Sequence, residues 1–294
     1  MTCNFDRVSD WEKNFKKKLA ALQSLLMEKH LLNGVSPVEC REFESKLESA
    51  VTDVIIAFEK PLVDPWKEAY TLNNMGIWFS IDTGIKERAD IPHQLVSDEQ
   101  AKSRQFRSLM EEMQREDILT DYLDKICGCI KNRRFPVNKL GGLLSLVNIL
   151  NADQIKYNDS ILRDMIEMAF KETEQSVFRS IGLEAMVYLL NKTLMMERYS
   201  SRLKSLISDI ITAMEADDEY EYHMNAFFRL VVAIKHTAFL DCFSPRLEQF
   251  FSKMLKVEYE KNPNFWYYWY FDITAIEDTK LLAIFEEWDR KHPE

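Results

Sequence analysis

The stretch SPVECREFESKLESAVTDVIIAFEKP, residues 36–61, decides the fold class of this chain. It opens with Ser36 and Pro37, which suit the N-cap and the first position of an α-helix. It stops at Pro61, which cannot continue a helix. Between these ends the large apolar residues recur every three or four positions, which places them on one face of a helix: Phe43, Leu47, Val51, Val54, Ile55 and Phe58. The stretch therefore predicts an amphipathic α-helix.

The same spacing recurs on both sides of this stretch. Upstream it predicts a helix that opens near Asp10 and stops at Gly34, and downstream Asp64 begins another helix. Residues 80–96, which include a glycine and a proline, are the weakest stretch for regular structure and are predicted to form a long loop. From Ser97 the helical pattern returns, and a change of phase near residues 116 and 117 predicts two helices or a kink.

The second half of the chain is rhythmic. Alternate helices of the predicted series start near residues 138, 175, 220 and 264, a spacing typical of HEAT and armadillo helical pairs. We therefore predict an all-α fold, either a multi-helix bundle or an irregular HEAT/armadillo-like stack, with an N-terminal region 1–96 and a repeat-like region 97–294 packed as one unit. The predicted helices of the series cover residues 138–150, 159–171, 175–191, 201–215, 220–239, 245–260, 264–274 and 277–290.

Composition narrows both fold and function. Only 7 glycines and 8 prolines occur in 294 residues, which disfavours β-rich and Rossmann-like folds with their many tight turns. The net charge is -10, and residues 151–294 hold 17 basic and 25 acidic side chains. An acidic surface disfavours nucleic acid and anionic membranes as partners, because both are polyanions, and it favours a basic partner.

The location and redox state of the chain are predicted from its N-terminus and cysteines. The N-terminus lacks the apolar core of a secretory signal, and the longest nearly uncharged apolar run, residues 140–150, is too short to span a membrane. The 5 cysteines are odd in number and scattered, whereas a disulfide framework needs pairs. We expect a cytoplasmic protein without disulfides.

Few residues carry a recognisable chemistry. The five histidines are far apart in the sequence, and none belongs to a metal-binding motif. Cys127 and Cys129 are too closely spaced for a zinc ribbon, and we interpret them as buried structural thiols. The pair Gly141-Gly142 lies within an apolar helix, where it is predicted to permit close helix packing. We predict no cofactor, no metal and no enzymatic activity.

One acidic run, which consists of Glu215, Asp217, Asp218, Glu219 and Glu221, remains as a possible cation site. Asp217, Asp218 and Glu221 have the spacing of an Asp-Asp-x-x-acid motif, which on a helix places the first and last carboxylates on neighbouring turns. Isoprenoid synthases are all-α enzymes that use such a motif to bind diphosphate through Mg²⁺, but no second acid-rich box accompanies it here. The alternative is a solvated turn whose acids favour the N-terminus of the next helix. A Mg²⁺-dependent enzyme that uses Asp217, Asp218 and Glu221 is therefore kept as one functional alternative.

The most unusual stretch is a run of consecutive aromatic residues, Phe265 to Phe271, which follows Asn262-Pro263-Asn264. Consecutive residues cannot all lie on one face of a helix, so either other elements cover this helix or part of the run faces outward. Trp and Tyr dominate interface hot spots. An outward cluster of Trp266, Trp269 and Tyr270 would therefore anchor a protein partner.

This aromatic run, followed by Ile273-Thr274-Ala275-Ile276 and a terminal helix, resembles the aromatic-rich C-terminal helix of some all-helical immunity proteins of bacterial toxin systems. The resemblance implies a cytoplasmic protein that neutralises a cognate toxin, often a nuclease, by covering its active site. The acidic run suits such a role, since a nuclease presents a basic cleft to phosphate. A general helical-repeat scaffold is the alternative. The predicted partner-binding residues are Asp217, Asp218, Glu219, Glu221, Trp266, Trp269 and Tyr270.

Overall fold

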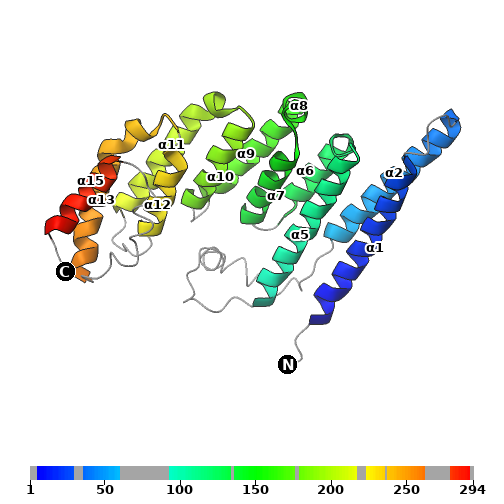
Figure 1. The fold of residues 1–294 in the computed structure, drawn as a ribbon, viewed down its shortest axis with the longest axis horizontal. Coiled ribbons are helices and arrows are strands. Elements are labelled where there is room, and N and C mark those ends of the chain that lie inside the picture. Colours follow the sequence, from blue (N-terminus) through cyan, green and yellow to red (C-terminus); the bar gives the residue numbers. More distant parts are fainter. Residues whose placement is uncertain are drawn as a thin grey trace. The chain divides into compact units, whose positions relative to one another are not determined.

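The computed structural model describes residues 5–29, 36–59, 93–133, 136–175, 179–216, 223–235, 237–261 and 279–291. These residues form 12 α-helices and one 3-10 helix without any strand, which confirms the predicted all-α class (Figure 1). In chain order the elements are α1 (Phe5–Lys29), α2 (Pro37–Glu59), α5 (His93–Arg115), η1 (Thr120–Tyr122), α6 (Leu123–Lys131), α7 (Pro136–Ile149), α8 (Ala152–Tyr157), α9 (Asp159–Gln175), α10 (Arg179–Lys192), α11 (Met196–Ala216), α12 (His223–Ile234), α13 (Leu240–Lys261) and α15 (Thr279–Lys291).

Helix α2 forms as its sequence predicts. The Ser36 hydroxyl accepts a hydrogen bond from the backbone N–H of Glu39 (3.4 Å), and the Glu39 carboxylate accepts one in return from the backbone N–H of Ser36 (3.1 Å). This reciprocal pair is a capping box, which satisfies two N–H groups that a helix start leaves free. The hydrogen bonds from Ser36 lower the pKa of Glu39. All six predicted apolar positions of the helix are buried.

The chain divides into two compact units, Met1–Met168 and Ala169–Glu294, and the division falls within α9. In the first unit α1 and α2 pack side by side and run antiparallel, since Lys18 pairs with Asp53 while Trp11 Nε1 donates to the Ala57 carbonyl (2.8 Å). Helix α5 begins at His93, so residues 93–96 of the predicted loop 80–96 are helical, and the rest of that predicted loop lies outside the described residues.

Among the described helices of the first unit, alternate helices pack against one another, and α1 and α5 run parallel. Gln105 of α5 bonds to Glu12 near the start of α1, and Glu112 further along α5 accepts a hydrogen bond from Gln23. In the same way α2 packs against α6, and α5 packs against α7. Stacked helical hairpins show this pairing of every helix with the next but one. Within this unit the arrangement is therefore that of a helical-pair stack.

Among the described helices of the second unit two pairs show the same pattern, since α10 packs against α12 and α11 packs against α13 (Figure 1). Helix α10 also packs against α11, and α13 packs against α15.

In the described segments most predicted helix ends match the observed ones to within four residues. Three ends differ by five residues: α11 starts at Met196 and not at 201, α12 ends at Ile234 and not at 239, and α13 starts at Leu240 and not at 245. The short helix α8 was not predicted; Asn151 caps it by accepting from the Gln154 N–H. Helix α13 starts five residues before the predicted Pro245, because a proline in the second turn removes only one intrahelical hydrogen bond.

An aromatic cluster centres the core of the first unit. Phe58, which is 2% exposed, stacks on Phe106 with ring centroids 4.8 Å apart and meets Phe15 edge-on at 6.4 Å. Two buried cations border the same ring, with Lys102 Nζ and Arg133 Cζ each 5.5 Å from the Phe58 centroid. Helices α1, α2 and α5 thus meet at one side chain, where dispersion and cation–π attraction add to apolar burial.

Two helices end in Schellman motifs without the usual glycine. After α5, the Ile118 N–H donates to the Met113 carbonyl (2.9 Å) and Asp117 adopts φ 55°. This turn confirms the break predicted from the change of phase. After α10, the Met195 N–H donates to the Leu190 carbonyl (2.9 Å) and Leu194 adopts φ 59°. A left-handed backbone crowds any Cβ, which is why glycine dominates this position.

Replacement of Leu194 by glycine is expected to stabilise the protein. The Leu194 side chain is 89% exposed and adds little burial, while its left-handed backbone costs about 1 kcal/mol relative to glycine. We expect Leu194→Gly to raise the free energy of unfolding by about 1 kcal/mol in urea titrations. Leu194→Ala keeps the Cβ and serves as the control. An equal gain in both variants would contradict the backbone explanation.

Candidate functional site

All seven residues predicted to bind a partner lie outside the described residues. Asp217, Asp218, Glu219 and Glu221 fall in the connection from α11 to α12, and the three aromatic anchors fall in the connection from α13 to α15. The predicted helix 264–274 lies in the latter segment as well. The described residues instead define the ends of α11 and α13, the helices from which these two connections leave.

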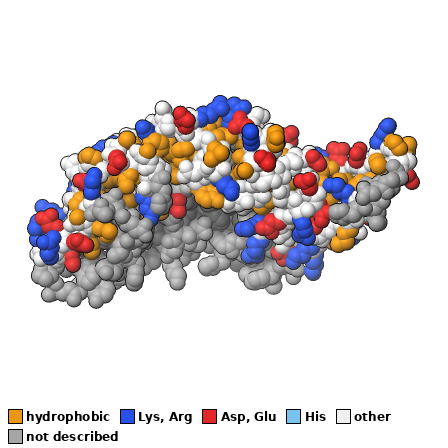
Figure 2. Space-filling view, turned by 45° about the horizontal axis from the view of Figure 1, so that its top comes forward, with side chains coloured by type: hydrophobic (Ala, Val, Ile, Leu, Met, Phe, Trp, Pro, Cys, Tyr) orange, Lys and Arg blue, Asp and Glu red, His pale blue; other side chains and the backbone are white. Residues whose placement is uncertain are grey.

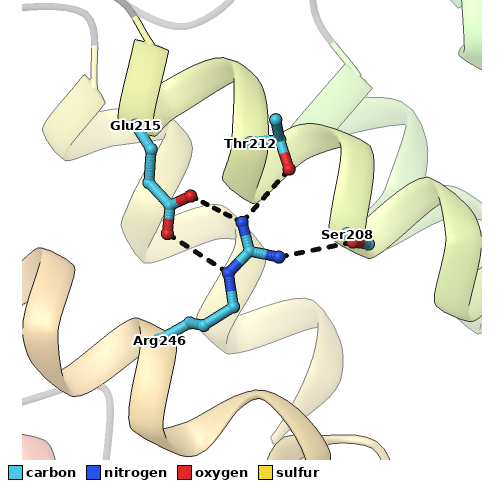
Figure 3. Close-up of polar contacts among 4 residues, drawn as sticks. All are labelled: Ser208, Thr212, Glu215 and Arg246. Atoms are coloured by element: carbon cyan, nitrogen blue, oxygen red, sulfur yellow. Dashed lines mark hydrogen bonds and ion pairs between the residues drawn. The ribbon is translucent and has the colours of Figure 1, made fainter.

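A polar cluster ties α13 to the end of α11 (Figure 3). The guanidinium of Arg246 binds the Glu215 carboxylate through both oxygens, with Nη2–Oε2 at 2.6 Å and Nε–Oε1 at 3.2 Å. It also donates to the hydroxyls of Thr212 (3.1 Å) and Ser208 (3.3 Å). Hydrogen bonding to Glu215 raises the pKa of Arg246, so the guanidinium stays charged at any physiological pH. We call these four residues the Arg246 clamp.

The Arg246 clamp was missed because Glu215 was interpreted as the first member of the acidic run. In the structure the Glu215 carboxylate forms an ion pair with Arg246. A signal was present in the sequence, since Ser208, Thr212 and Glu215 are spaced by four and three and therefore share one face of α11. Helix α11 packs against a helix on each side, so two hydroxyl groups and one carboxylate on the same face can bind a single cationic side chain from a neighbouring helix.

The ends of α11 and α13 point toward the same edge of the second unit. Lys204 lies over the Phe239 ring at 5.1 Å, and further along both segments Arg246 meets residues 208–215. Contacts that advance together along two segments mean that these run parallel. With Arg246 opposite Thr212, α13 continues about 11 residues, roughly 16 Å, past the level of Ala216. We call this the C-terminal edge of the unit.

The acidity of the second unit is concentrated in the two segments that follow α11 and α13 in the sequence. The described segments from residue 169 onward contain 13 acidic and 15 basic side chains, so they are nearly balanced. The two connections 217–222 and 262–278 contain no lysine or arginine. Their acids are Asp217, Asp218, Glu219, Glu221, Asp272, Glu277 and Asp278. The excess negative charge of this half therefore belongs to the segments that follow α11 and α13.

A second ion pair resembles the Arg246 clamp but lies near the other end of α11. Arg202 binds Glu174 of α9 through both carboxylate oxygens at 2.7 and 3.0 Å, and its guanidinium lies 4.6 Å from the Phe170 ring centroid. The side chains of this pair are 34% and 39% exposed, against 37% and 40% for Arg246 and Glu215. The two pairs are thus matched in geometry and solvent exposure.

The described residues hold no group of His, Cys, Asp and Glu side chains suited to a metal ion. Cys127 and Cys129 are buried, as predicted, and burial raises the pKa of each thiol to about 12. Neither thiol is a nucleophile near neutral pH, because the thiolate is the reactive form. These two cysteines therefore act as small apolar residues in the packing of α6.

The raised pKa of these thiols predicts alkaline destabilisation. Because the folded state holds both protons more tightly, stability is full below the unfolded pKa of about 9 and declines toward pH 12. We expect the free energy of unfolding, measured in urea, to fall less steeply over this range in the Cys127→Ala, Cys129→Ala double variant. The control is Cys242→Ser, which removes an exposed thiol. Equal slopes in all three proteins would contradict the assignment.

The visible surface of the described residues carries no large patch of one sign. Figure 2 shows basic, acidic and hydrophobic side chains interspersed over the face turned toward the viewer. Within the described segments no helix is both long and apolar enough to cross a membrane.

Comparison with known proteins adds no assignment. No family model matches the chain, and neither the curated proteins nor the solved structures give a match.

Proposed function

We propose that this chain is a non-enzymatic protein that binds a basic protein partner at the C-terminal edge of its second unit. The partner class that fits best is a bacterial toxin domain with a basic active-site cleft, which the chain neutralises by covering it. The observation that carries the proposal is the separation of charge in this unit. The charges of its described helices are nearly balanced, whereas all charged residues of the two connections that follow α11 and α13 are acidic.

Physical reasoning connects this separation to inhibition. Acidic segments that leave neighbouring parallel helices add their potentials, which speeds encounter with a basic surface in a salt-sensitive manner. The helix C-termini contribute further partial negative charge. The aromatic residues Trp266, Trp269 and Tyr270 lie in the second of these connections and would supply the apolar anchors that slow dissociation.

The proposal is tested by capture of the partner. The tagged protein is incubated with lysate of its source and washed at rising salt, and the retained proteins are identified by mass spectrometry. We expect one stoichiometric basic protein that is released as the salt concentration rises. Several weak partners would favour a general scaffold, which the stacked helical pairs of each unit also suit. Magnesium-dependent stabilisation abolished by Asp217→Ala would favour the enzyme.

Charge reversal gives the corresponding prediction. Asp217→Lys with Glu221→Lys is expected to slow association with the captured partner by about tenfold or more at low salt, because steering weakens. The matched control reverses Glu197 and Asp241, exposed acids near the N-terminal ends of α11 and α13. We expect the control to retain its association rate, measured by biolayer interferometry. Equal association rates for both double variants would contradict a role of Asp217 and Glu221 in partner association.

A further inference from the structure

We infer that Arg246 is a positioning residue, which holds the last turn of α11 against α13 and so fixes the point where the chain enters residues 217–222. Its consequence for binding rests on the proposed function, but the positioning itself is a property of the isolated protein. Glu215 lies in the last turn of α11, one residue before the helix ends at Ala216. Whatever holds Glu215 in place also holds the start of this connection.

The geometry of the Arg246 clamp supports this role. One guanidinium contacts three residues on two successive turns of α11, Ser208, Thr212 and Glu215 (Figure 3). Helix ends fray because their last four carbonyls lack intrahelical partners. The planar guanidinium of Arg246 contacts side chains along the last two turns of α11 and so opposes this fraying. Its bidentate contact fixes both the distance and the orientation of the Glu215 carboxylate.

The position of Arg246 along α13 strengthens the inference. Arg246 directly follows Pro245, whose ring fixes the backbone at that point, and precedes Leu247, which is 1% exposed. The base of the side chain is thus anchored by the packing of α13. The clamp therefore ties the end of α11 to the second turn of α13, and it fixes how far the end of α11 lies from its parallel neighbour. Preorganised spacing lowers the entropic cost of binding a partner through both connections.

The test measures that spacing directly. Spin labels are attached at Ala216→Cys and Glu260→Cys, exposed positions near the ends of α11 and α13, in a background that carries serine at Cys3, Cys40 and Cys242. Pulsed electron–electron resonance then gives the distance distribution between the labels. We expect Arg246→Ala to broaden this distribution about twofold, and hydrogen exchange of the amides in residues 212–216 to accelerate about three- to tenfold. Arg246→Lys, which keeps one contact to Glu215, should recover part of the effect.

The matched control is Arg202→Ala, which breaks the ion pair of equal exposure near the opposite end of α11. Arg202 also lies over the Phe170 ring, so its removal, like that of Arg246, breaks contacts in addition to the ion pair. We expect Arg202→Ala to leave the label distances and the exchange in residues 212–216 unchanged. Equal broadening by both variants, or none by Arg246→Ala, would overturn the positioning role. Because no partner is present, these results are independent of the charge-reversal test and of its failure.

Discussion

Phe58→Ala is expected to lower the free energy of unfolding of the first unit by about 3–5 kcal/mol, the range for a buried phenylalanine truncated to alanine. The Phe58 ring stacks on Phe106, touches Phe15 and is bordered by Lys102 and Arg133. Truncation opens a cavity among three helices and removes the aromatic face from two buried cations. Urea unfolding followed by circular dichroism measures the loss.

The control for Phe58 is available two residues away on the same helix. Ile56 is 61% exposed, so Ile56→Ala truncates a large apolar side chain on the protein surface and leaves the core intact. We expect this variant to change stability by less than about 0.5 kcal/mol. A similar loss in both variants would mean that α2 is not buried as described.

Gly182→Ala is expected to lower the free energy of unfolding of the second unit by about 1–3 kcal/mol through overpacking. A Cβ at this position would lie 2.5 Å from Thr173 Cγ2 and 2.8 Å from its hydroxyl oxygen. Thr173 is 1% exposed and β-branched, so its side chain has little freedom to move aside. Helices α9 and α10 would have to separate, which thermal unfolding would detect.

Two further variants isolate the contact between Gly182 and Thr173. Thr173→Ala in the Gly182→Ala background removes the clashing methyl and hydroxyl groups, and we expect it to restore most of the lost stability. The Thr173 hydroxyl has no hydrogen-bond partner in the described structure, so its removal strands no polar group. Gly141→Ala is the second control; its Cβ meets nothing within 4 Å, and helix propensity predicts a gain of up to about 1 kcal/mol. Destabilisation by Gly141→Ala would contradict the steric account.

The glycine pair shows what the sequence could and could not predict. We predicted that Gly141 and Gly142 permit close helix packing, and only Gly142 does, since its Cβ would lie 3.2 Å from Ile130 of α6. The sequence gives no prediction for Gly182, a single glycine in an apolar helix, although its Cβ would make the shortest contact among the described glycines. Periodicity predicts which face of a helix is buried, but the side chain that meets a given glycine depends on which helices become neighbours.

The same limit explains the outcome for the polar residues. The caps and apolar stripes were predictable because they depend on residues within a few positions of one another, as at Ser36 and Glu39. The Arg246 clamp joins residues 31 to 38 positions apart, and the sequence alone gave Glu215 to the acidic run. The spacing of the helices left a bundle and a helical-pair stack as alternatives, and the choice between them depends on long-range contacts, which single-helix patterns do not encode.

Neutralisation of the captured partner is the direct test of the proposed inhibitor function. The basic protein retained in the capture experiment is expressed in a bacterial host under an inducible promoter, with and without this chain, and growth is followed after induction. The account predicts that the partner alone arrests growth, that the wild-type chain restores it, and that the Asp217→Lys, Glu221→Lys variant restores it poorly while the Glu197→Lys, Asp241→Lys control does so fully. A partner that is harmless alone, or whose toxicity this chain leaves unchanged, would contradict the inhibitor function.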